Sequence, residues 1–235
     1  MWLFLWVVFV IVAIGYFLWS YHTIYEQKRA WRAFATKFNL QYFPGKMMES
    51  PAMSGMIKGH DVNFYPQMVD TPQGRKVNQN VVEVFLNNRP DLITVVSTPG
   101  LSDFVSSLGM PEPFSVQHPE WPKNLLSRTF ENEAPVSWFL GDEKRIKALQ
   151  KLSKLPFDWA FMCDLQQSFI AVRASNPLSD PAKLNKLMGL MFDVIKDLED
   201  KTVPKEHAET QGQDTIANPK DDKVTQDSSN DASKE

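Results

Sequence analysis

Histidine is the residue type with which this chain of 235 residues could perform acid–base or metal chemistry near neutral pH, and it occurs four times. His22 closely follows an apolar N-terminal segment and His207 lies in a polar C-terminal stretch, so neither is expected in a preorganised site. His60 precedes Asp61, and such a pair could bind a metal or transfer protons, although turns also favour these polar residues. His118 stands in a proline-rich stretch without a ligand-type residue at helical or strand spacing. An enzyme that uses these histidines is therefore the least favoured hypothesis.

The single cysteine, Cys163, is expected to be buried and unreactive. Along an expected strand it alternates with Phe157, Trp159 and Phe161, so these four side chains share one apolar face. The sequence contains no serine nucleophile elbow, phosphate-binding glycine loop, paired metal-ligand spacing or calcium loop. We therefore expect no catalytic residue, no metal site and no cofactor.

The elements that position these residues begin with the apolar segment Met1–Trp19, which carries no charged side chain. As a helix it spans about 28 Å, close to the ~30 Å hydrocarbon core of a bilayer. Tryptophan and tyrosine residues lie near its two ends, where such rings favour the membrane boundary. A signal peptide would need a small-residue cleavage site, and a soluble helix would keep a polar stripe. The sequence predicts an uncleaved transmembrane helix over residues 1–21, in contact with the lipid bilayer.

Four basic residues follow this segment closely, namely Lys28, Arg29, Arg32 and Lys37. Basic residues flank membrane spans preferentially on the cytoplasmic side, which places the rest of the chain in the cytoplasm. A single thiol agrees with a reducing compartment. We predict a single-pass protein of the cell (inner) membrane with a cytoplasmic C-terminal domain.

The C-terminal residues 201–235 are expected to be disordered, because they contain almost no large apolar side chains. They carry five lysines and eight acidic residues, which accounts for the net charge of −3 of the whole chain. The rest of the chain is therefore neutral. A neutral domain with a weakly acidic tail gives no reason to expect nucleic-acid binding.

Residues 22–39 are expected to form a juxtamembrane helix, and residues 40–200 one α+β domain with an antiparallel sheet and helices packed on it. Short β-branched runs between polar turns predict the strands, and one hairpin is expected to turn at Gly59–His60. Asn39 is expected to end the first helix. The expected strands are 40–43, 55–58, 61–65, 80–86, 92–97, 157–165 and 169–174, and the expected further helices are 102–108, 142–155 and 179–198.

Two sets of aromatic residues are candidate contact sites. Trp31, Phe34 and Phe38 recur at helical spacing, so they lie either in the membrane interface or against the domain, with packing the favoured interpretation. Phe114 and Trp121 flank the proline-rich stretch and are candidate contacts for a protein partner, although a loop folded back on its own domain is the favoured reading.

The sequence resembles a bacterial family of membrane-anchored proteins of unknown function. The resemblance rests on residues 34–42, on the turn glycines Gly55 and Gly59, and on the strand residues 82–84. It implies an N-terminal anchor followed by an α+β domain over roughly residues 30–198, with no established activity. Many such proteins have two spans, whereas this sequence shows one.

Three functions remain open from sequence. The favoured one is a membrane-anchored, non-enzymatic domain that binds a protein partner or scaffolds a complex. The alternative is a domain that binds lipid or another apolar ligand at the membrane surface through one of the two aromatic sets. The third is a membrane-tethered enzyme that uses His60–Asp61 or His118.

Overall fold

The computed structural model describes residues 1–70, 74 and 76–199, and the predicted disordered tail lies outside this range. The chain begins with a single 37-residue helix, α1 (Trp2–Phe38). The predicted segments 1–21 and 22–39 are parts of this one helix, since no proline interrupts its backbone hydrogen bonds. Asn39 ends it in the left-handed conformation, with φ of 55°, which asparagine tolerates better than most residues.

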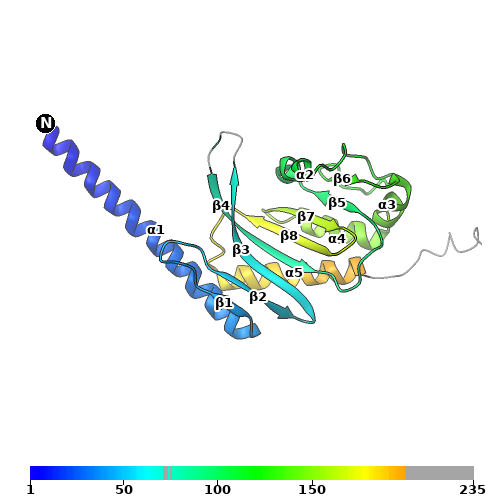
Figure 1. The fold of residues 1–235 in the computed structure, drawn as a ribbon, viewed down its shortest axis with the longest axis horizontal. Coiled ribbons are helices and arrows are strands. Elements are labelled where there is room, and N and C mark those ends of the chain that lie inside the picture. The colour runs from blue at the N-terminus through cyan, green and yellow to red at the C-terminus, as the bar shows by residue number, and fades with distance from the viewer. Residues whose placement is uncertain (71–73, 75, 200–235) are drawn as a thin grey trace, which may run out of the picture. The chain divides into compact units, whose positions relative to one another are not determined.

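The N-terminal half of α1 is apolar and lies free of the domain (Figure 1). Its most apolar 18-residue window has a mean hydropathy of 2.4, and none of that window is buried. Within the described part of the chain, α1 is the one helix long and apolar enough to cross a membrane. These properties fit a membrane anchor, and a signal sequence shares them.

The domain is built on one eight-stranded antiparallel sheet, as the predicted α+β class requires. From one edge to the other the strands are β1 (Gln41–Phe43), β2 (Ala52–Ile57), β3 (His60–Asp70), β4 (Lys76–Phe85), β8 (Ser168–Ala174), β7 (Asp158–Cys163), β5 (Thr94–Ser97) and β6 (Leu126–Thr129). Every neighbouring pair is antiparallel. The pairing of β4 with β8 joins residues about ninety positions apart, and it makes one sheet out of two hairpins.

Helices cover one face of this sheet and enclose the core (Figure 1). This face packs against the C-terminal half of α1 and against α3 (Glu133–Leu140), α4 (Glu143–Ser153) and α5 (Pro181–Glu199). A short 3₁₀ turn, η1 (Pro99–Leu101), and α2 (Ser102–Ser107) follow β5. The core is therefore a single apolar layer between the sheet and the helices.

Buried polar groups fix the C-terminal half of α1 to the domain. The Gln27 side-chain amide donates to Asn80 Oδ1 on β4 at 2.9 Å, and the Asn80 amide donates in turn to the Asn176 carbonyl at 3.1 Å. The Trp31 indole donates to the Leu178 carbonyl at 3.2 Å. Because a buried polar group is costly without its partner, these bonds favour one docking position of the helix.

Each predicted strand and helix is present, but several bounds differ, since β3 extends to Asp70 and β4 begins at Lys76, and β6 was not predicted. The first hairpin turns at Lys58–Gly59, one residue before the predicted turn, because both residues adopt the positive φ that a tight hairpin turn requires. The segment around Val136 forms α3, in which Pro135 occupies the first turn, where a missing N–H is tolerated.

Candidate functional site

On the sheet face opposite the helices, η1 and α2 are the helical segments that the described part of the chain places there, and they lie at one end. Side chains alternate along each strand, so Val82 and Val172 point to the core while their neighbours point away from it. We call this second side the uncovered face. Its central residues on β3, β4, β8 and β7 are Tyr65, Gln67, Val81, Glu83, Phe169, Ala171, Arg173 and Met162.

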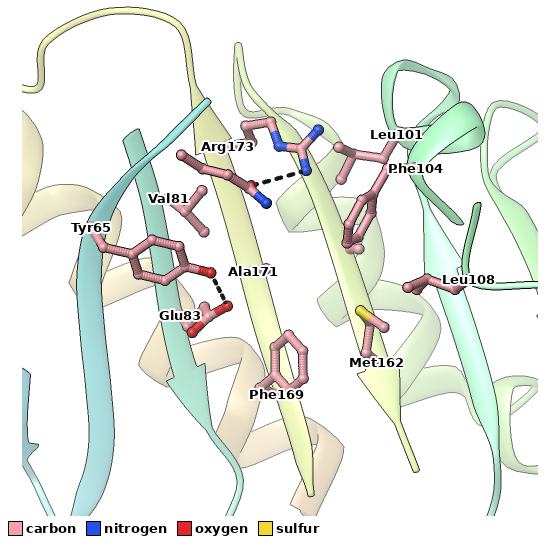
Figure 2. Close-up of a pocket in the computed structure, with 12 residues that line it drawn as sticks. Tyr65, Val81, Glu83, Leu101, Phe104, Leu108, Met162, Phe169, Ala171 and Arg173 are labelled. Carbon is pink, nitrogen blue, oxygen red and sulfur yellow. Dashed lines mark hydrogen bonds between the residues drawn. The ribbon is translucent and has the colours of Figure 1, made fainter. Parts of the chain in front are cut away.

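A hollow of about 110 Å³ lies in the uncovered face, next to α2 (Figure 2). Strand residues form its floor, while Leu101, Phe104 and Leu108 form the wall on the side of η1 and α2. Most of its lining side chains are half-buried. The hollow therefore combines an apolar wall with polar groups on the strands.

Tyr65 and Glu83 form the shortest polar contact in the hollow. The Tyr65 hydroxyl donates to Glu83 Oε1 at 2.6 Å across neighbouring strands (Figure 2). Burial raises the pKa of the Tyr65 phenol above its ordinary value, and the hydrogen bond to Glu83 and its negative charge raise it further. Tyr65 therefore stays a neutral hydrogen-bond donor near neutral pH.

Arg173 supplies the positive charge of the hollow. Its guanidinium donates to Gln67 Oε1 at 3.3 Å and lies over the Phe104 ring, 4.9 Å from the centroid. Burial lowers the pKa of Arg173, and the charge of Asp158 opposes this effect. Arginine remains protonated even so. The stacking on Phe104 holds the guanidinium at the edge of the apolar wall.

The hollow is small, and its polar side chains are held by one another. Its two polar pairs, Tyr65–Glu83 and Arg173–Gln67, hold their side chains in fixed positions. Pockets for whole small molecules measure about 300–1,000 Å³, so this hollow has room for one protruding side chain or a group of that size. Among the described residues no cluster of three or more His, Cys, Asp or Glu side chains could hold a metal ion.

The predicted aromatic stripe on α1 packs into the domain. Trp31 is 0% exposed and its ring meets Phe64 edge-on at 5.7 Å. Phe34 is 3% exposed and contacts both Phe64 and Phe38. Phe38 is half-buried and packs against the core. Trp31 and Phe34 therefore have no surface left with which to contact a bilayer.

Phe114 and Trp121 both lie partly buried against the core. The Phe114 N–H donates to the Ser127 carbonyl at 2.8 Å and so attaches the proline-rich stretch to the edge strand β6. The Gln150 side chain on α4 donates to the Glu120 carbonyl at 2.8 Å, beside Trp121. Neither aromatic side chain lines the hollow in the uncovered face. Their contact with a partner stays a prediction.

His60 and Asp61 do not meet, because successive strand residues point to opposite faces. His60 Nδ1 lies 3.0 Å from the Phe85 carbonyl oxygen and 3.8 Å from Glu199 Oε1, on the helix side of the sheet. Asp61 is exposed on the other side. The carboxylate of Glu199 is beyond hydrogen-bond distance from the ring, and it accepts from the backbone N–H of Asn87 at 2.5 Å.

His118 contributes to loop structure. Its Nδ1 accepts from the Glu120 backbone N–H at 3.2 Å, which closes a short turn. Among the residues that the structure describes, neither histidine belongs to a cluster of three or more possible metal ligands, and the hypothesis of a histidine-based enzyme stays untested.

Cys163 is buried among core residues, and burial raises the pKa of its thiol to about 12. Because the thiolate is the reactive form, we expect a maleimide to modify Cys163 only as fast as the domain unfolds. Intact-mass measurement with and without denaturant tests this expectation. Rapid labelling of the folded protein would contradict the burial of this residue.

Sequence reasoning missed the residues of the hollow, although a signal for one solvated face was present. Asn63, Tyr65 and Gln67 alternate with Val62 and Phe64 along β3, which is the pattern of a strand with one polar side. That pattern identifies the face, but the positions of Glu83 and Arg173 depend on strand pairing.

Comparison with known proteins gives no information on function. No protein-family model matches the chain, and no curated protein matches it in sequence. The resemblance to membrane-anchored bacterial proteins therefore depends on residues 34–42, the turn glycines and the strand residues alone.

Proposed function

We propose that this chain is a single-pass membrane protein that binds a protein partner through its uncovered face and catalyses no reaction itself. The apolar half of α1 is the anchor, in the cell (inner) membrane, and the sheet domain lies in the cytoplasm. The observation that carries the proposal is the hollowed, half-buried face of Tyr65, Glu83 and Arg173, on a domain whose other face is closed by helices.

Size and composition both favour a protein as the occupant of this face. A volume of about 110 Å³ fits one apolar side chain that protrudes from a partner, and is small for a free metabolite. Tyrosine, arginine, phenylalanine and methionine line the hollow, and these residue types are enriched in protein interfaces. Tyr65 and Arg173 are held in place before binding, which lowers the entropy lost on association.

A photo-crosslinking amino acid at Phe169 tests this proposal in cells that produce the full chain. Phe169 lines the hollow, so we expect one discrete adduct with a second protein, identifiable by mass spectrometry. The same crosslinker at Phe130, which is 57% exposed outside this face, should not give that adduct. An absence of any adduct at Phe169 would overturn the proposed binding face.

A matched pair of substitutions separates loss of binding from a general effect of added charge. Ala171→Glu places a carboxylate on the floor of the hollow and should reduce the adduct about tenfold or more. Ala182→Glu adds the same group to the exposed first turn of α5, where an acidic residue is tolerated. Equal crosslinking by the two variants would count against the hollow as the contact.

The cytoplasmic orientation gives a separate expected result. Protease added to intact cells or spheroplasts should leave residues 40–199 undigested, because Lys28, Arg29, Arg32 and Lys37 favour the cytoplasmic side. Detergent permeabilisation should then expose the domain to the protease. Digestion before permeabilisation would reverse the proposed orientation.

A further inference from the structure

A basic groove runs along the outer side of α1, just beyond the apolar segment. Its volume is about 440 Å³, within the range of small-molecule sites. One wall is the helix itself and the other is β1 with the residues that follow it. The residues used in the argument below are Tyr25, Lys28, Arg29, Arg32 and Tyr42.

The arginines of the groove form no ion pair within 4.0 Å with any described acidic side chain. Arg29 and Arg32 are exposed, lie one helical turn apart, and have guanidinium groups without a hydrogen bond or ion pair to any described residue. The nearby carboxylate of Glu49 is instead 3.8 Å from Lys46 Nζ. Two adjacent arginines are therefore free to bind an anion.

The rest of the groove is held in a fixed shape. The Lys28 ammonium donates to the Met47 carbonyl at 3.4 Å and also to the Lys46 carbonyl. These bonds connect the helix to the opposite wall of the groove. The Tyr42 hydroxyl donates to the Lys28 carbonyl at 3.2 Å. Burial raises the pKa of Tyr42, and the nearby charge of Arg32 opposes this rise. Arg32 therefore sits beside a neutral phenol and not beside a carboxylate.

If residues 1–21 span the bilayer, the backbone of the groove lies just beyond the lipid headgroup layer, and its arginine side chains can extend toward that layer. Arg29 is about 12 Å and Arg32 about 16 Å beyond residue 21 along the helix axis. The headgroup layer extends about 5–8 Å beyond the hydrocarbon core. Helix side chains slant toward the N-terminus, which favours guanidinium positions closer to the bilayer than the backbone, and a tilt toward the groove side brings them closer still.

We propose that the basic groove binds the phosphate of an anionic glycerophospholipid, with Arg29 and Arg32 as its ligands. Arginine presents a planar fork of donors that matches phosphate oxygens, and Tyr25 lies on the membrane side of the two arginines. A lipid is favoured over a soluble phosphate because α1 carries the groove directly out of its apolar half. The inference depends on the proposed anchor.

Native mass spectrometry of the full chain tests the groove. The protein is held in mild detergent with an equimolar mixture of phosphatidylglycerol and phosphatidylcholine, and the bound lipids are counted. A basic residue near an anionic surface contributes about fivefold in association, so wild type should retain phosphatidylglycerol over phosphatidylcholine. Arg29→Gln should lower that preference about fivefold, and Arg29→Gln with Arg32→Gln should bring it near unity.

A second double variant controls for net charge. Lys123→Gln with Lys154→Gln removes the same charge from exposed positions outside the groove and should leave the lipid preference unchanged. Equal preference of wild type for the two lipids, or an equal loss in both double variants, would overturn the groove as a lipid site. Displacement of the bound lipid by inorganic phosphate would identify a soluble anion as the ligand instead.

Flotation with phosphatidylcholine vesicles separates this inference from the anchor on which it depends. The wild type and both double variants should float equally, because the apolar segment is intact in all three. A chain that does not float would refute the anchor and with it the proposed function. A chain that floats but shows no preference for phosphatidylglycerol would refute the lipid site alone.

Discussion

Replacing Ile11 and Val12 with arginine should release the protein from the membrane fraction. Both residues lie near the middle of the apolar segment, and their side chains are 64% and 63% exposed because nothing in the domain covers them. An arginine at the centre of a membrane helix costs about 2.5–3.5 kcal/mol, so two shift insertion by roughly four orders of magnitude. Extraction of membranes at alkaline pH, followed by immunoblotting of pellet and supernatant, measures the effect.

The matched control is Ile11→Leu with Val12→Leu, which keeps the segment apolar and should stay in the pellet. Intact-mass measurement of the wild type adds a second check. An uncleaved anchor retains Trp2 to Trp19, whereas a cleaved signal sequence would lose them. Identical fractionation of the arginine and leucine variants would contradict the anchor.

Trp31→Ala should destabilise the domain by about 3–5 kcal/mol, a large share of the ~5–15 kcal/mol that stabilises a typical domain. Trp31 is completely buried between α1 and the sheet, where its ring contacts Phe64. Alanine leaves a cavity there and also removes the donor to the Leu178 carbonyl. Denaturant unfolding of the full chain in detergent, followed by circular dichroism, measures the loss.

Phe130→Ala is the control, because Phe130 is 57% exposed and its truncation should change stability by less than about 0.5 kcal/mol. The comparison also decides between the two interpretations of the aromatic stripe on α1. A residue that served only the membrane interface would leave the unfolding midpoint unchanged when truncated. An equal midpoint for Trp31→Ala and wild type would therefore contradict the packing seen here.

The sequence predicted those features that depend on a few neighbouring residues. Asp142 and Asp180 were expected at helix starts, and each accepts hydrogen bonds from the backbone N–H groups of the helix it precedes. Asn39 ends α1 as expected. Short apolar and β-branched runs located seven of the eight strands, and β6 (Leu126–Thr129) was not predicted.

Features that depend on the pairing of distant segments could not be predicted from neighbouring residues. The order of strands places β8 beside β4 and β5 beside β7, and only this order brings Arg173 near Gln67 and Tyr65. Likewise, Glu199 reaches His60 because α5 ends beside the first hairpin, a placement with no local sequence signal. The hollow and the basic groove both join residues from elements whose contact follows from tertiary packing.

Because α1 is continuous, a tilt of its apolar half would also tilt the domain that packs on its C-terminal half. If residues 1–21 span the bilayer, a helix that matches a ~30 Å hydrocarbon layer can adapt to a layer about 3 Å thinner by leaning about 25°. With no hinge between the apolar half of the helix and the buried contacts of Gln27 and Trp31, the sheet turns through the same angle. Membrane thickness would in this way change the direction in which the hollow of Tyr65 and Arg173 faces, relative to the membrane surface.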